Sequence, residues 1–168
     1  MTLAEITIAA LLFLRPAEED RARLEAFGRD IAAVVRDHEI EAAWLPGAVD
    51  PLPLGTPERT ALALVAIAQH ESGLRADVAD CRVLGDAGQA FTAFQLRGHL
   101  ALGGHSTRAL CRSPRQAAAR ALAVLARHGR CGEKGAFYGY ASGRCDRPSD
   151  AARRQIKIWR DLLTRFMR

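Results

Sequence analysis

The sequence predicts a mostly α-helical protein with little or no β-sheet. Alanine, leucine and arginine, all good helix formers, dominate the 168 residues. Runs that alternate valine, isoleucine or threonine with polar residues, which would predict strands, are missing. With 49% apolar and 26% charged residues, the chain has the composition of a globular protein rather than a disordered one. Its length allows one hydrophobic core but hardly two independent domains.

The first apolar run, residues 6–14, predicts a short helix that is buried or faces a partner. It is too short to cross a bilayer, which takes about 20 residues. It also makes a poor signal peptide, because Glu5 precedes it where a basic residue is expected and Arg15-Pro16 follow without a small-residue cleavage site. We therefore expect no export signal and no transmembrane segment.

A second helix is predicted over residues 17–43, where apolar side chains recur every three or four residues. Together the two helices form an N-terminal helical extension, residues 1–45. Residues 46–55 follow as a proline-rich connector, since a helix cannot continue through its prolines. The stripe of the second helix consists of Leu24, Phe27, Ile31 and Val34, with His38 at its end.

The clearest helix start lies at Thr56-Pro57-Glu58. Thr56 is a suitable N-cap, Pro57 fits the first helical turn, and Glu58 suits the positive end of the helix dipole. Apolar residues then occupy most faces as far as Glu71, which is typical of a buried helix. Gly73 is well placed to end it. We expect this helix to be the central one.

The rest of the main domain, residues 56–168, is predicted to combine a long loop with three further helices. Residues 74–110 are glycine-rich and show little periodicity. Loops of this length are uncommon in compact domains and are usually functional. Helices are predicted after Ser113, over residues 133–141 and after Ser149. The last of them presents on one face Ile156, Trp159, Leu163 and Phe166.

The net charge is +5, and the only lysines are Lys134 and Lys157, so arginine supplies nearly all the positive charge. A basic surface favours anionic partners, which include nucleic acid, acidic lipids and the anionic polymers of a bacterial cell wall. Solvated arginine side chains without such a partner are the alternative. Charge alone does not choose between them.

Glu71 is the leading candidate for catalysis. A carboxyl at the end of an apolar helix has its pKa raised by burial, which makes it a proton donor near neutral pH. A glycine-rich loop that carries Asp86 and Gln95 follows within reach. This combination indicates sugar-cleaving chemistry. The alternative is a glutamate at a helix end whose carboxylate points into water.

The motifs resemble those of the lysozyme-like superfamily, specifically the lytic transglycosylases and goose-type lysozymes. That family has a glutamate and a serine ending a buried helix, then a loop of the form G-D-x-G-x-x-F-G-x-x-Q, then Y-N-A-G. Here the counterparts are Glu71-Ser72, the sequence GDAGQAFTAFQ at residues 85–95, and YASG at residues 140–143. The three occur in the family's order. The resemblance implies a lysozyme-like helical catalytic domain over residues 56–168, with a glycine-rich active-site loop.

The resemblance also implies a substrate and roles. Glu71 would be the catalytic acid on peptidoglycan, acting at the bond between N-acetylmuramic acid and N-acetylglucosamine. Ser72 would be a polar contact in the cleft, Gln95 would bind sugar or N-acetyl groups, and Tyr140 would hydrogen-bond near Glu71. Amide and phenol groups suit neutral, hydroxyl-rich sugars. The alternatives are a loop-capping amide for Gln95 and a core aromatic for Tyr140.

Asp86 bears on the type of reaction. In goose-type enzymes an aspartate in this loop is thought to help position water for hydrolysis, whereas lytic transglycosylases lack it and let the muramyl 6-hydroxyl attack. Asp86 matches the goose-type position, which favours hydrolysis. Two departures weaken the match, because Thr92-Ala93 replace the usual glycine-containing turn and Arg97 stands where another acid is often found. Asp86 could equally be a loop-structuring residue.

No cofactor or metal is expected. His70-Glu71 begins like the zinc motif H-E-x-x-H, but Leu74 occupies the position of the second histidine. The four cysteines include no C-x-x-C pair, so a zinc ribbon is not expected either. We favour the disulfides Cys81–Cys111 and Cys131–Cys145, because each would brace a loop around the proposed site. The alternative is four reduced thiols, as in a cytosolic protein.

The expected partner is therefore the peptidoglycan glycan strand, in the periplasm or outside the cell. Because residues 1–14 read poorly as an export signal, we expect delivery by a virion, release with a holin, or export by a specialised secretion machine. The N-terminal extension could dock to such a machine or virion. The rival hypothesis is a basic helical binding or structural virion module, for nucleic acid or cell wall, without catalytic activity.

Overall fold

The protein is all-α in its computed structural model, which describes residues 1–45, 47, 49–98 and 103–167. These residues contain eight α-helices, two short 3-10 helices and no β-sheet; their isolated bridges include those between Gly85 and Ala90 and between Phe91 and Leu96. The prediction of a mostly helical fold is confirmed. The helices are α1 (Leu3–Leu14), α2 (Arg21–Trp44), α3 (Pro57–Ser72), α4 (Ala76–Ala79), η1 (Asp86–Gly88), α6 (Thr107–Arg112), α7 (Pro114–Arg127), η2 (Gly129–Cys131), α8 (Gly132–Ser142) and α9 (Asp150–Phe166).

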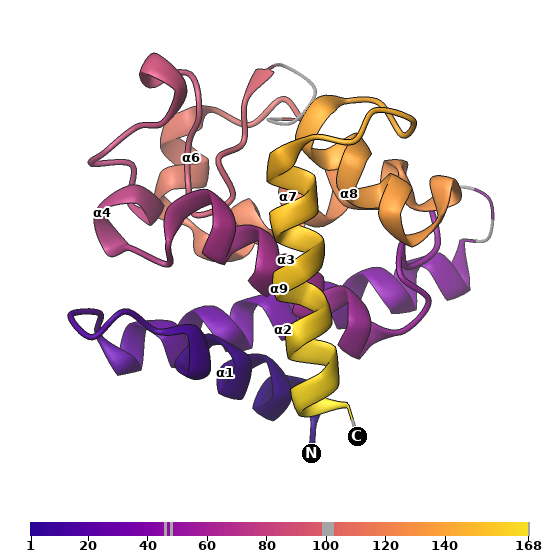
Figure 1. Cartoon of the computed structure of the whole chain (residues 1–168), viewed down its shortest axis with the longest axis horizontal. Helices are drawn as coiled ribbons and strands as arrows, with labels where there is room; N and C mark the ends of the chain where they lie inside the picture. The colour runs from indigo at the N-terminus through magenta and orange to yellow at the C-terminus, as the bar shows by residue number, and fades with distance from the viewer. Residues whose placement is uncertain (46, 48, 99–102, 168) are drawn as a thin grey trace.

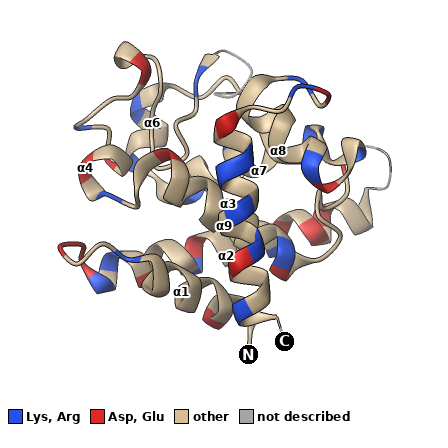
Figure 2. Ribbon diagram, in the orientation of Figure 1, with Lys and Arg blue, Asp and Glu red and all other residues tan. Residues whose placement is uncertain are grey.

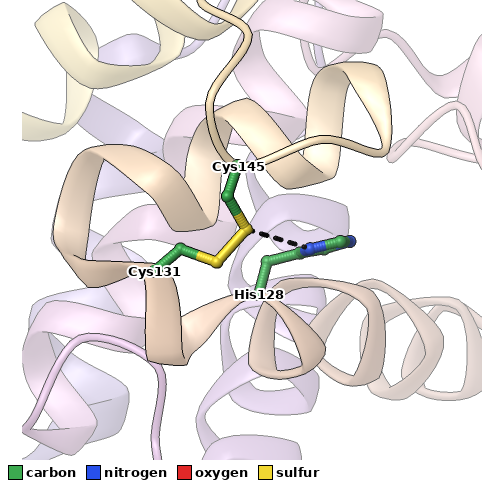
Figure 3. A group of neighbouring side chains, drawn as sticks. All are labelled: His128, Cys131 and Cys145. Atoms are coloured by element: carbon green, nitrogen blue, oxygen red, sulfur yellow. Dashed lines mark hydrogen bonds between the residues drawn. A yellow bond between two sulfur atoms is a disulfide. The ribbon is translucent and has the colours of Figure 1, made fainter.

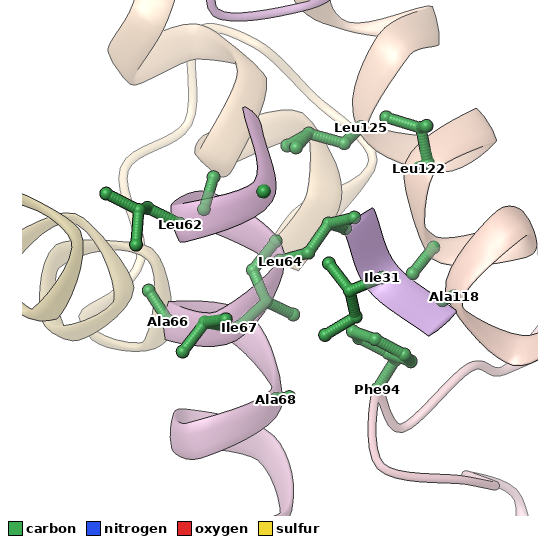
Figure 4. Close-up of a cluster of buried hydrophobic side chains, with 14 of the residues drawn as sticks. Ile31, Leu62, Leu64, Ala66, Ile67, Ala68, Phe94, Ala118, Leu122 and Leu125 are labelled. Carbon is green, nitrogen blue, oxygen red and sulfur yellow. The ribbon is translucent and has the colours of Figure 1, made fainter. Parts of the chain in front are cut away.

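Helix α3 crosses the centre of the protein, as its sequence predicts. The Thr56 hydroxyl accepts a hydrogen bond from the Arg59 amide, Pro57 begins the helix, and Gly73 ends it in the left-handed conformation. All eight residues from Ala61 to Ala68 have an exposed fraction of 0%. Figure 4 shows side chains of α3, among them Leu62, Leu64 and Ile67, packed with apolar side chains from other parts of the chain. The labelled residues from those other parts include Ile31, Phe94, Leu122 and Leu125.

Helices α1 and α2 pack against each other and against α3, and their apolar residues belong to the same hydrophobic core as those of α3 (Figure 1). They approach closely at Gly28, where a Cβ atom would lie 2.7 Å from Ile8 Cγ1. Helix α2 begins later than residue 17, because residues 16–19 form a turn and the Asp20 side chain caps the helix by accepting from the Ala22 amide. None of the described helices is long and apolar enough to cross a membrane.

The described part of the long loop after α3 holds only short helices, as predicted. They are α4, η1 and α6, and Figure 1 shows α4 and α6 on its left side, in the upper half of the view. The disulfide Cys81–Cys111 joins the beginning of this segment to the end of α6, and its Cα atoms are 5.5 Å apart. The two predicted disulfides are both present, since Cys131 and Cys145 are also bonded.

Helix α9 closes the fold by packing on α3 and α8. The Ser149 hydroxyl caps it by accepting from the Ala152 amide. Trp159 is its main anchor, because the indole ring is 99% buried and its Nε1 donates a 2.9 Å hydrogen bond to the carbonyl oxygen of Arg59. This contact fixes α9 alongside α3, and so determines which α9 side chains reach the end of α3.

Candidate active site

A cleft of about 340 Å³ opens at the C-terminal end of α3. Four of the five predicted site residues line it: Glu71 from α3, Asp86 and Gln95 from the following loop, and Tyr140 from α8. We call residues 85–97 the active-site loop. The remaining lining residues are Ala90, Leu96, Arg97, Val124, Ala141 and Ala151.

Glu71 lies one residue before the end of α3 and is half-buried. Burial raises the pKa of its carboxyl above the ordinary value of 4.5, because the charged form loses contact with water. Two contacts oppose this rise without reversing it. Gln155 Nε2 donates a 2.6 Å hydrogen bond to Glu71 Oε1, and the positive charge of Arg97 also favours the carboxylate.

Tyr140 connects α8 to the active-site loop. Its hydroxyl donates a 2.9 Å hydrogen bond to the carbonyl oxygen of Phe94, whose ring is fully buried in the core. Burial raises the pKa of Tyr140 well above 10.0, and the negative charge of Glu71 raises it further. The phenol is therefore neutral where it lines the cleft, and its oxygen can still accept a hydrogen bond from a ligand.

Asp86 forms an ion pair with Arg97 across the active-site loop. Both side chains are more than half exposed, at 51% for Asp86 and 61% for Arg97. Asp86 has a positive φ of 49°, a conformation that aspartate tolerates better than most residues. The pair therefore shapes the rim of the cleft, and an exposed pair of this kind contributes only about 0–1 kcal/mol to stability.

Gln95 both lines the cleft and holds the loop in shape. Its Nε2 donates a 3.0 Å hydrogen bond to the carbonyl oxygen of Thr92. Its Oε1 occupies the space that a Cβ atom would need at Gly85, so any larger residue at that position would displace the Gln95 side chain. A sugar that bonds to the Gln95 amide would therefore contact a side chain that is already oriented.

Ser72 is the one predicted site residue that the structure does not bring to the cleft. Its side chain is buried, and its hydroxyl donates to the carbonyl oxygen of Ala68 at 2.7 Å and accepts from the Leu74 amide at 3.2 Å. Ser72 therefore completes the C-terminal end of α3, and helps to fix the backbone that carries Glu71.

Gln155 is the site residue that sequence reasoning missed. It stands on the buried face of α9 between apolar neighbours, and its exposed fraction is 0%. A glutamine at an apolar position of an amphipathic helix was the available signal, because buried amides require a partner. The sequence did not reveal the partner, since 84 residues separate Gln155 from Glu71.

One group of possible metal ligands occurs among the described residues, away from the cleft. His128 Nδ1 and the sulfur atoms of Cys131 and Cys145 lie within 4.8 Å of one another (Figure 3). Both sulfur atoms belong to the disulfide, with His128 Nδ1 3.6 Å from Cys145 Sγ. Cysteine binds a metal as the thiolate, and the sulfur atoms of Cys131 and Cys145 are bonded to each other instead. This group therefore does not form a metal site while the disulfide is intact.

The cleft thus combines a carboxyl of raised pKa with an amide, a neutral phenol and an ion pair at its rim. Such a set can donate one proton and offer hydrogen bonds to a polar, uncharged ligand. Comparison with known proteins adds nothing to this geometry. No protein-family model, curated protein or solved structure matches the chain.

Proposed function

We propose that this chain is a peptidoglycan-cleaving glycosidase with a lysozyme-like fold, in which Glu71 is the general acid. The observation that carries the proposal is the half-buried Glu71 carboxyl, with its raised pKa, among the residues that line an open cleft. Cleavage of a glycosidic bond needs a carboxylic acid that keeps its proton near the working pH. The amide of Gln95 and the phenol of Tyr140 suit the hydroxyl and N-acetyl groups of a glycan strand.

In the proposed reaction Glu71 gives up one proton and then accepts another. Glu71 transfers its proton to the oxygen between N-acetylmuramic acid and N-acetylglucosamine, and the bond from the muramyl C1 to that oxygen breaks. The resulting Glu71 carboxylate then accepts a proton from the hydroxyl that attacks C1, which restores the acid. Attack by the muramyl 6-hydroxyl leaves an anhydro sugar, and attack by water leaves a reducing end.

Asp86 bears on which hydroxyl attacks. Its position in the motif favours hydrolysis, and its side chain lies at the rim of the cleft in an exposed ion pair with Arg97. We propose reducing ends as the main product, and mass spectrometry of the released fragments distinguishes them from anhydro-muramyl ends.

The distribution of charge gives little support to the rival role in nucleic-acid binding. Along α9, basic and acidic residues are interspersed (Figure 2), and Arg153 and Lys157 pair with Asp150 and Asp161 of the same helix. Nucleic-acid interfaces instead gather unpaired Lys and Arg on one face. The two disulfides also fit the proposed place of action, because disulfides persist in oxidising compartments outside the cytosol.

Zymography on purified peptidoglycan tests the proposal. Wild-type protein should clear the gel, and Glu71→Gln, which keeps the shape but cannot donate an acid proton, should not. Glu58→Gln is the matched control, since Glu58 lies in the first turn of the same helix, at its opposite end from the cleft, and should clear like wild type. Clearing by Glu71→Gln at the wild-type rate would remove Glu71 from the mechanism. Absence of clearing by wild type, together with salt-sensitive DNA binding, would favour the rival.

A further inference from the structure

Gln155 makes an unusual contact with the Glu71 carboxyl. Its side chain is fully buried, and its Nε2 donates a 2.6 Å hydrogen bond to Glu71 Oε1. The other end of the same amide, Oε1, is buried without a hydrogen-bond partner among the described residues. A buried acceptor without a partner is costly and calls for an explanation.

The groups around Glu71 do not supply this missing partner. The charged or titratable residues that line the cleft beside Glu71 are Asp86 and Arg97 from the active-site loop and Tyr140 from α8. Asp86 and Arg97 pair with each other, and the Tyr140 hydroxyl donates to Phe94. Among these groups, Glu71 alone forms a hydrogen bond with the Gln155 side-chain amide.

The unpaired oxygen has a use when Glu71 is protonated. A carboxylate needs a donor, which Gln155 Nε2 provides, whereas a carboxylic acid needs an acceptor for its own proton. Rotation of the amide by half a turn would place Oε1 against the Glu71 hydroxyl. In the orientation seen, Oε1 makes no hydrogen bond to a described residue, so the reversal breaks no hydrogen bond at that end of the amide.

We propose that Gln155 is a positioning residue that holds the Glu71 carboxyl in one place in both protonation states by reversing its side-chain amide. This inference rests on the proposed function, in which Glu71 first gives up a proton and then takes one back. The carboxyl would keep its position through both steps, because the same side chain first accepts a hydrogen bond from it and then donates one to it.

Nuclear magnetic resonance of the wild-type protein tests the amide reversal without any substrate. One proton of the Gln155 side-chain amide should resonate at low field while Glu71 is ionised. As Glu71 becomes protonated, the resonance of that proton should move away from low field. The pH midpoint of this change should equal the midpoint at which the chemical shift of the Glu71 carboxyl carbon titrates. A Gln155 amide signal that does not change through the Glu71 titration would overturn the reversal.

Gln155→Met tests the positioning role, because methionine has a similar length and no donor. The midpoint of the Glu71 titration should rise by about one pH unit, since hydrogen bonds to a charged group are stronger than those to a neutral one. The high-pH limb of kcat should move up by the same amount, with kcat lowered at least about tenfold and KM little changed. An unchanged titration and pH profile would reduce Gln155 to a packing residue.

Gln69→Met is the matched control. Gln69 also has a buried Oε1 without a partner, but it precedes Glu71 by two residues on α3 and so faces another direction. It should leave the Glu71 titration unchanged, and a rise as large as that of Gln155→Met would overturn the inference. The titrations need no glycan. If wild type fails to cleave peptidoglycan, the proposed function fails, while these measurements still decide whether Gln155 holds Glu71.

Discussion

Glu71→Gln is predicted to stabilise the protein at neutral pH even though it removes the proposed activity. Burial raises the pKa of Glu71 in the folded protein above the ordinary value of 4.5. Between that value and the folded pKa, the folded state holds a proton that the unfolded chain has released, so stability falls as the pH rises. The loss is complete above the folded pKa. Glutamine avoids it, because it is uncharged and can still accept the hydrogen bond from Gln155.

The size of the effect follows from the linkage and from the length of the chain. Each pH unit between the two pKa values costs about 1.4 kcal/mol of unfolding free energy. A chain of 168 residues has an unfolding entropy of about 350 cal/mol/K near its melting temperature. Each pH unit therefore corresponds to about 4 °C in Tm. The advantage of Glu71→Gln should be absent below pH 4.5 and should grow at this rate until it reaches a plateau.

Thermal unfolding of both proteins, followed by circular dichroism from about pH 3 to about pH 8, measures this difference. The pH at which the plateau begins reports the folded pKa of Glu71. Glu58→Gln should show no such gain, because a negative charge in the first turn of α3 favours the helix. A Tm difference that does not vary with pH, or a loss of stability at neutral pH, would refute the argument that burial governs this carboxyl.

Two further predictions concern the stability of the loop that follows α3. Serine at both Cys81 and Cys111 opens a disulfide with a sequence separation of 30, which should lower the unfolding free energy by about 3.6 kcal/mol through the entropy of the unfolded chain. Urea denaturation checks this, and an unchanged midpoint would mean that the disulfide contributes nothing. Tyr140→Phe removes the 2.9 Å hydrogen bond to the Phe94 carbonyl and should cost about 1 kcal/mol, or about 3 °C in Tm. An equal Tm would show that water replaces the bond.

Local signals in the sequence predicted the helices well. The caps Thr56, Ser113 and Ser149 each accept the hydrogen bond expected of them, because capping involves residues only two or three positions apart. The start of α2 was placed too early, at residue 17. Helical periodicity does not mark where a helix begins, and the Asp20 cap determines it.

The candidate site was predicted in part. Glu71, Asp86, Gln95 and Tyr140 all line the cleft, although they come from α3, the active-site loop and α8. Ser72 does not, because its hydroxyl is used within the end of its own helix. Neighbours in sequence on a helix point in different directions, so the position next to Glu71 did not guarantee access to the cleft.

The sequence by itself determined the helical fold class, the buried central helix and the residue at its end. These depend on composition, on apolar periodicity and on caps, which act over one or two helical turns. Only the tertiary structure decided the environment of Glu71. Gln155 reaches it across 84 residues because Trp159 fixes α9 against α3, and burial among packed helices raises its pKa. Such contacts depend on how helices meet in space, which no local pattern records.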